Sequence, residues 1–197
     1  MRRQKILIAC LMRLIPLMAL GACSTTEPTV SQRLDEGTGV TISYARTPFL
    51  LVRDIPAYGA YARSFVQLGA IEVNRMGSRE YFLWMSTWNT DHVAGAAEHR
   101  DGFDSAVLFV DGEPIALDVH GWTHDMIGAS QPIYVRPFAS STDAYYRVTI
   151  NQMALIALAD DLWLRTGGKQ PRDFQLWDEQ AAARADFVEF VQRLGGD

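Results

Sequence analysis

The chain has 197 residues, of which 48% are hydrophobic, and a formal net charge of −5 at pH 7. This acidic balance argues against nucleic acid as a partner, because proteins that bind phosphate backbones carry a surplus of Lys and Arg. The only two cysteines, Cys10 and Cys23, both lie near the N-terminus.

Residues 1–22 have the pattern of a secretory signal peptide. Three of the first five side chains are basic, and the stretch from Ile6 to Ala22 is almost wholly apolar. This stretch is too short for a transmembrane helix, and Arg13 and Pro16 interrupt it. The pattern therefore predicts export, with residues 1–22 cleaved from the mature chain.

The residues around the expected cleavage point resemble a known family motif. Leu20-Gly21-Ala22-Cys23 is similar to the lipobox of bacterial lipoproteins, in which the chain is cut before the cysteine and the thiol is lipidated. The resemblance implies a lipid on Cys23, a fatty acid such as palmitate. In that family an Asp after the cysteine favours the inner membrane, so Ser24 implies the outer membrane, facing the periplasm. The alternative is a conventional signal peptide followed by an unmodified cysteine.

Lipidation of Cys23 would leave the mature chain without a free thiol or a disulfide. A cysteine nucleophile and a cysteine-based zinc site would then be excluded. Loss of the four basic residues in 1–22 would change the net charge from −5 to −9. The lipid, rather than attraction to anionic headgroups, would therefore hold the protein at the membrane.

Beyond the cysteine, the sequence predicts a tether and one domain. Residues 23–39 contain only two sizeable apolar side chains, Val30 and Leu34, and therefore predict a lipidated cysteine followed by a flexible tether. Residues 40–197 have a suitable length for a single globular domain.

Residues 40–148 show mostly the period-two alternation of β-strands. We expect strands over 40–45, PFLLVRD after Pro48, 62–74 and 80–88 on either side of an MGSR turn, 105–110, 113–119, 132–138 and 145–148. Asp111-Gly112 is the two-residue turn of the clearest hairpin, in which Val110 pairs with Glu113. The nitrogen of Pro114 then faces away from the partner strand, which predicts a sheet edge or a bulge there.

The last third of the chain adds helices. Thr149 and Gln152 have the spacing of a capping box, which predicts a short helix over about 150–160, apolar nearly all round and buried against the sheet. Strands are expected at 162–166 and 173–177. Asp178 would cap a final helix over about 179–194, ending at Gly195. Together these elements predict a mainly antiparallel, sandwich-like α+β domain.

No standard catalytic motif is present, but the histidines are unevenly distributed. All four, His92, His99, His120 and His124, lie in two polar segments that flank the Asp111-Gly112 hairpin, and Asp118 lies beside the second segment. A two-residue hairpin brings the open ends of its strands together, so both segments should emerge at the same end of the domain. These five side chains are candidate ligands for a divalent transition metal such as zinc, copper or iron. Alternatively they are ordinary loop residues, because His and Asp tolerate solvent and turns.

An aromatic group has two interpretations as well. Its members are Tyr81, Phe82, Trp84, Trp88, Trp122, Tyr134, Tyr145 and Tyr146. Such side chains occur at partner surfaces and ligand clefts, but in a β-domain of this size they more often form the core.

The sequence favours an outer-membrane-anchored periplasmic lipoprotein with no cofactor. We expect it to act as a non-catalytic binding or envelope-assembly module for an envelope protein or a small ligand. One alternative is a metal-binding or metal-dependent periplasmic protein that uses loops 91–104 and 118–125. Another is a carrier of lipids or hydrophobic ligands, which would need an apolar cavity.

Overall fold

The computed structural model describes residues 29–58, 61–90, 100–178 and 180–195. The predicted signal peptide and lipidation site therefore lie outside the described residues. The strands are β1 (Val30–Asp35), β2 (Val40–Ala45), β3 (Phe49–Asp54), β4 (Arg63–Arg75), β5 (Ser78–Asn89), β6 (Ser105–Val110), β7 (Glu113–Gly121), β8 (Thr142–Val148), β9 (Leu162–Thr166) and β10 (Asp173–Leu176). The helices are η1 (Pro56–Tyr58), η2 (His124–Ile127), α2 (Ile150–Leu158) and α3 (Ala181–Gly195).

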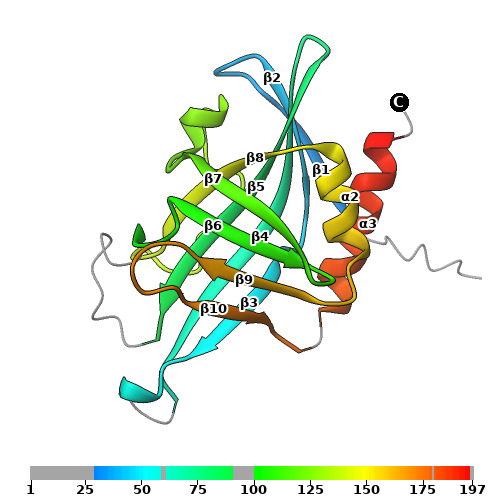
Figure 1. Ribbon diagram of the computed structural model, residues 1–197. Coiled ribbons are helices and arrows are strands. Elements are labelled where there is room, and N and C mark those ends of the chain that lie inside the picture. The colour runs from blue at the N-terminus through cyan, green and yellow to red at the C-terminus, as the bar shows by residue number, and fades with distance from the viewer. Residues whose placement is uncertain (1–28, 59–60, 91–99, 179, 196–197) are drawn as a thin grey trace, which may run out of the picture.

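Eight of the described strands close into a barrel (Figure 1). Around the barrel the order is β4-β3-β10-β9-β6-β7-β8-β5, and β5 pairs back with β4. All of these pairings are antiparallel. The predicted mainly antiparallel β-domain with two helices is therefore confirmed, and its sheet closes into a barrel, a more specific arrangement than the sandwich-like one expected. The 13-residue β4 pairs with β5 from Ser64 to Arg75, so the sheet stays continuous where a sandwich would separate into two sheets.

The N-terminal strands extend the barrel sheet on one side. The first half of β4 pairs with β3, and its second half, Ile71–Asn74, pairs with β2. β1 pairs with β2 from Val30 to Asp35, so the predicted tether over 23–39 is wrong from Val30 onward. Few apolar side chains are needed there, because backbone pairing with β2 orders β1. Of its two sizeable apolar side chains, Val30 is buried and Leu34 is 64% exposed.

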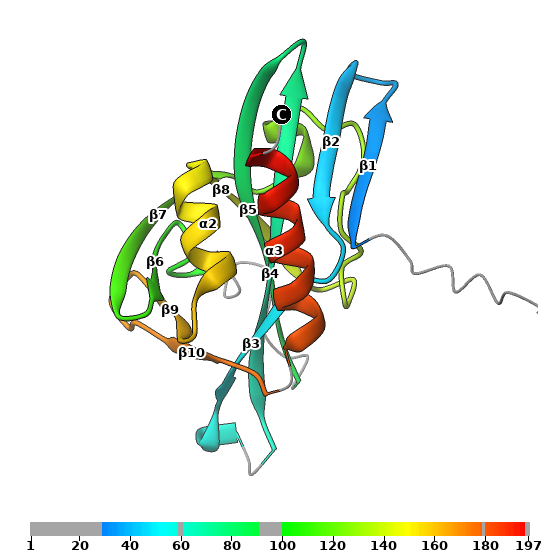
Figure 2. The same ribbon diagram turned by 90° about the vertical axis from the view of Figure 1, so that its right-hand side faces the viewer.

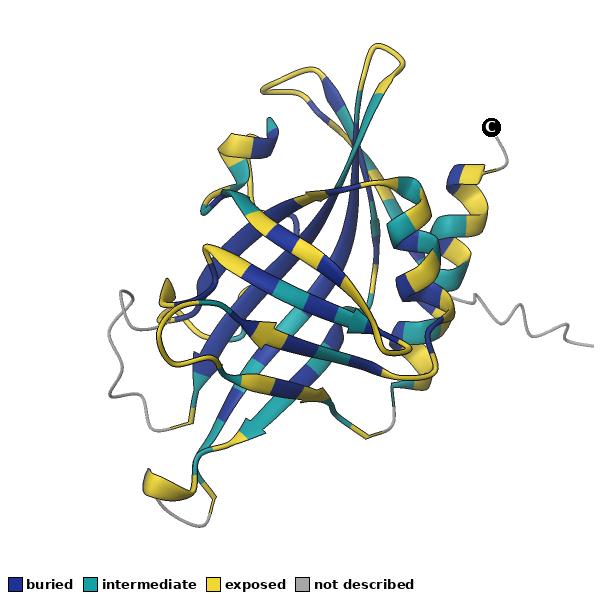
Figure 3. Cartoon of the chain, in the orientation of Figure 1, coloured by how far each residue is buried: buried dark blue, intermediate teal, exposed yellow. Residues whose placement is uncertain are grey.

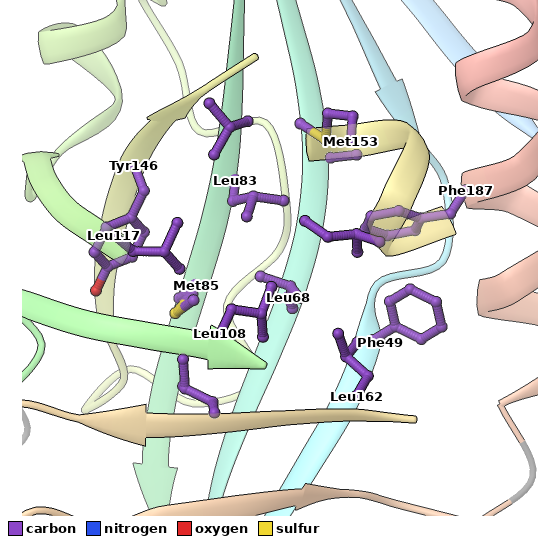
Figure 4. Close-up of a cluster of buried hydrophobic side chains, with 14 of the residues drawn as sticks. Phe49, Leu68, Leu83, Met85, Leu108, Leu117, Tyr146, Met153, Leu162 and Phe187 are labelled. Atoms are coloured by element: carbon purple, nitrogen blue, oxygen red, sulfur yellow. The ribbon is translucent and has the colours of Figure 1, made fainter. Parts of the chain in front are cut away.

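The barrel interior is filled by its own side chains. Leu68, Leu83, Leu108, Leu117 and Tyr146, on five strands, are buried in one cluster (Figure 4). Alternate residues of β6 and β7 are buried and exposed, as expected when one face of a strand points inward (Figure 3). The filled interior argues against the hydrophobic-carrier interpretation.

Helices α2 and α3 pack together at one end of the barrel (Figure 2). Phe187 of α3 contacts Phe49 of β3 with ring centres 4.6 Å apart, and Met153 of α2 is buried in the same cluster. The short helix expected over about 150–160 is present as α2, and Met153, Ile156 and Ala157 on one face are buried in the core. Its other face is open to solvent, since Leu155 and Leu158 are 56% and 71% exposed. Neither helix combines the length and hydrophobicity required to cross a bilayer, as judged over the described residues.

Local signatures predicted the turns and helix ends well. Val110 pairs with Glu113 around Asp111 and Gly112, whose φ angles are 51° and 85°. β7 pairs with β8 only at Val119 and Gly121, so the edge predicted at Pro114 is confirmed. The capping box at Thr149 is present, and α3 ends at Gly195 as expected. However, α3 begins at Ala181, later than the Asp178 cap implied.

The segment 122–141, called the covering segment below, crosses the outer face of β4, β5 and β8. Ile133 and Tyr134 are both buried there, in a cluster with Trp84 and Tyr145. The strand predicted over 132–138 is wrong: the segment pairs with no strand in the described structure, and its two prolines, Pro132 and Pro137, have no N–H to donate to a sheet. The core interpretation of the aromatic group is confirmed for its buried members, which are Phe82, Trp84, Trp88, Tyr134, Tyr145 and Tyr146.

Candidate functional site

The two histidine-bearing segments do emerge at the same end of the domain. The Val119 N–H donates to the Asp104 carbonyl at 3.0 Å, and the Arg100 guanidinium lies 5.1 Å from the centre of the Trp122 ring. The juxtaposition predicted from the hairpin is therefore confirmed for the described parts of both segments. His92 and His99 lie outside the described residues.

The described candidate metal ligands, His120, His124 and Asp118, do not converge on a common centre. Nε2 of His120 lies 3.2 Å from the Met126 carbonyl oxygen, and its ring is 5.4 Å from that of Phe82. His124 begins the short helix η2, and Asp118 is exposed on β7. Within the described residues, no three His, Cys, Asp or Glu side chains come together as a metal site would require. The metal interpretation stays a prediction that depends on His92 and His99.

A polar pocket is lined by residues of β3, β4, β5 and the β9–β10 loop. These segments meet at the end of the barrel away from α2 and α3 (Figure 1). We call this polar pocket the open-end pocket; its volume is about 360 Å³. The described residues that line it are Arg53, Ile55, Ala57, Ser64, Asn89, Asp101, Gln170, Pro171 and Arg172. A barrel mouth is a common place for a ligand site, because several strands and loops converge there around a concave surface.

Strand register places three polar residues of the pocket in one row. Arg53 of β3 is the pairing partner of Ser64 of β4, which in turn pairs with Asn89 of β5. Directly opposed residues have Cβ atoms about 5 Å apart on the same face. Ser64 shares its face of β4 with the interior residues Val66 and Leu68, so the row lines the inside of the barrel.

Another part of the pocket wall is built around Arg172, from the loop between β9 and β10. Its guanidinium donates to the Asp101 carbonyl and lies 5.4 Å from the centre of the Phe103 ring. Its N–H donates to Oγ1 of Thr166 at 2.9 Å, and its carbonyl accepts from the Thr166 N–H at 2.9 Å. Backbone and side chain are therefore both held in place, and Arg172 adds a second guanidinium to the described lining of the pocket.

Other arginines already engage the carboxylates close to Arg53. Asp54 accepts from Nε of Arg63 at 2.9 Å, and Asp173 accepts two hydrogen bonds from Arg165, both of 2.7 Å. The hydrogen bonds from Arg165 lower the pKa of Asp173, and the nearby charges of Arg165 and Arg53 lower it further. Among the described lining residues, two arginines therefore face a single aspartate, Asp101.

This arrangement is chemically suited to binding. Its described lining offers guanidinium, amide and hydroxyl donors together with the carboxylate of Asp101. Sequence reasoning missed the pocket residues because it considered histidines and carboxylates as metal ligands and did not consider arginines on distant strands. Arg53, Ser64 and Asn89 become neighbours only once the strand register is known.

Comparison of the chain with protein-family models, curated protein sequences and solved structures finds no match. The functional argument therefore rests on the residues of this chain and on their geometry.

Proposed function

We propose that the protein is an outer-membrane lipoprotein, anchored through Cys23 and facing the periplasm, that acts as a non-catalytic binding module for another envelope component. The lipobox resemblance at Leu20-Gly21-Ala22-Cys23 supports the anchor. The open-end pocket supports the binding role.

The observation that carries the binding role is the contrast between the two ends of the barrel. At one end, Phe187 and Met153 of the helices join the apolar core. At the other end, a pocket of about 360 Å³ is lined mainly by polar side chains. Because the space between the ends is filled, a partner would be recognised at the open end rather than enclosed in the barrel.

A labelling experiment tests the anchor. Cells that produce the full chain are grown with radiolabelled palmitate, and the wild type is compared with Cys23→Ala and Cys10→Ala. The wild type and Cys10→Ala should both incorporate the label and fractionate with the outer membrane. Cys23→Ala should incorporate none, because the acceptor thiol is gone. Label on Cys23→Ala, or none on the wild type, would rule out this anchor.

Metal analysis tests the competing metal-dependent function. The mature chain, purified without added metal, is compared with His99→Ala and His120→Ala. We expect no stoichiometric metal in the wild type. Stoichiometric zinc, copper or iron that is lost in either variant would favour the metal-dependent function instead.

A further inference from the structure

We propose that the open-end pocket binds an oxyanion group, a carboxylate or a phosphate, carried by a small molecule or by the end of a larger one. Arg53 would be its principal ligand, with Ser64 and Asn89 as neighbouring hydrogen-bonding groups. This inference rests on the proposed binding function and adds the chemical class of the ligand.

The charge balance of the pocket favours an anion. Arg53 and Arg172 both line it. The acidic groups near Arg53 are occupied, since Asp54 pairs with Arg63 and Asp173 with Arg165. Within the described part of the chain, an anionic ligand would therefore meet the guanidinium of Arg53 beside carboxylates that already have arginine partners, on a chain whose overall charge is −5.

The row on β3, β4 and β5 supplies donors matched to an oxyanion. A guanidinium presents several N–H groups in one plane and often binds carboxylate or phosphate through two hydrogen bonds. Ser64 is only 2% exposed, and Asn89 is half-buried, so hydrogen bonds from this row would form away from bulk solvent. Such bonds are stronger than their exposed counterparts.

The floor and rim of the pocket limit the size of the ligand. Directly inward from the row, Leu51 pairs with Val66, and both side chains are completely buried, which prevents deeper entry. Ile55, Ala57 and Pro171 add apolar surface at the pocket. These features suit an anionic head placed against the polar row, with a short apolar part against this surface.

Matched probe pairs test the inference. The mature, full-length chain is labelled with ¹⁵N and titrated with N-acetylalanine or N-acetylalaninamide, and separately with glycerol 3-phosphate or glycerol. Within each pair the anionic probe should shift the backbone amides of Arg53, Ser64, Asn89 and Arg172 in a saturable way. The neutral probe should bind at least about tenfold more weakly, because it lacks the charge that strengthens hydrogen bonds to guanidinium. The two arms also show whether carboxylate or phosphate is preferred.

Three variants make the test specific. Arg53→Gln should weaken anion binding by at least about tenfold, and Asn89→Asp, which places a negative charge in the row, should abolish it. Arg193→Gln, which removes an exposed arginine from α3, is the matched control and should bind as the wild type does. Thermal unfolding of each variant shows whether its fold is retained.

The results separate this inference from the proposed function. Equal binding of the neutral and anionic probes, or anion binding unchanged in folded Arg53→Gln and Asn89→Asp, would overturn the inference. Binding of an uncharged envelope component at the same amides would also overturn it, yet would leave the binding function intact.

Discussion

At the scale of single residues, Asp35 joins the turn between β1 and β2 to the covering segment. Its carboxylate accepts from Oγ of Ser130 at 2.5 Å, from the Ser130 N–H at 2.7 Å and from the Gly37 N–H at 3.1 Å. The hydroxyl of Ser130, followed by its backbone N–H, lowers the pKa of Asp35 below the ordinary value. This carboxylate therefore stabilises the folded state in its ionised form.

Asp35→Asn should consequently change the acid sensitivity of the fold. A carboxyl group whose pKa falls on folding stabilises the protein fully above its unfolded pKa, about 3.9, and this contribution is lost as the pH falls through the folded value. The wild type should thus be more stable than the variant at pH 7, and the difference should shrink below about pH 4. Urea unfolding at pH 7 and below about pH 4 measures the difference in unfolding free energy between the wild type and Asp35→Asn. The variant Asp178→Asn is the control for the general effect of removing one negative charge. A difference that stays constant with pH would contradict the assignment.

Gly69 is a second important residue, because the absence of a Cβ atom there lets the Tyr134 ring pack against β4. Tyr134 stacks on Trp84 with ring centres 4.6 Å apart, and its hydroxyl lies within hydrogen-bond distance of the carbonyl oxygens of Ala45 and Ala70, at 2.6 and 2.9 Å. A Cβ at Gly69 would lie 2.5 Å from carbons of the Tyr134 ring. Only glycine at this position allows the covering segment to approach β4 so closely.

Gly69→Ala should therefore displace Tyr134 and destabilise the protein by about 1–3 kcal/mol, the usual cost of overpacking. Thermal unfolding measures the loss, and near-ultraviolet circular dichroism should report the disturbed Tyr134–Trp84 stack. Gly195→Ala is the control, since nothing lies within 4 Å of its added Cβ. An unchanged dichroism spectrum in Gly69→Ala would show that the contact is not maintained.

At the scale of elements, the β6–β7 hairpin is attached to the connection between α2 and β9. Oδ1 of Asp111 accepts from the N–H groups of Asp160 and Asp161 at 2.9 and 2.8 Å, and the Asp111 N–H donates to the Asp161 carbonyl at 2.9 Å. Asp111 also has a φ of 51°, a conformation that Asp and Asn tolerate better than most residues. Asp111 thus stabilises the hairpin turn and also connects it to the segment between α2 and β9.

Asp111→Ala should cost about 1–3 kcal/mol of stability, because it removes the acceptor and leaves a strained φ. Asp111→Asn keeps an oxygen at Oδ1 and the tolerance for positive φ, so it should stay close to the wild type. Chemical unfolding of the two variants provides the comparison. Equal losses in both would mean that the negative charge, rather than the turn and its two hydrogen bonds, matters.

The elements that the sequence predicted are those encoded locally. The Asp111-Gly112 turn, the Thr149 capping box and the Gly195 helix end each depend on residues a few positions apart. The errors involve distant partners: β1 is ordered by β2, and residues 132–138 are held by the sheet that they cover. Period-two patterning reports which residues are buried but not which strands pair.

At the scale of the whole molecule, closure of the barrel creates the candidate site. Arg53, Ser64 and Asn89 are brought into one row by the pairing of β3, β4 and β5, and the β9–β10 loop adds Arg172. None of these residues belongs to a recognisable motif, so the sequence alone did not reveal them. The histidine spacing did identify the correct end of the domain, because Asp101, next to the first histidine segment, also lines the pocket.

The central claim is that the protein binds an envelope component at the open end of its barrel. The most direct measurement is a pair of two-dimensional amide spectra of the ¹⁵N-labelled mature chain, with and without the low-molecular-mass fraction of a solubilised cell envelope. The account predicts shifts concentrated at Arg53, Ser64, Asn89 and Arg172, with α2 and α3 unaffected. Shifts confined to the helices or to the outer face of the barrel, or no shifts at all, would contradict it.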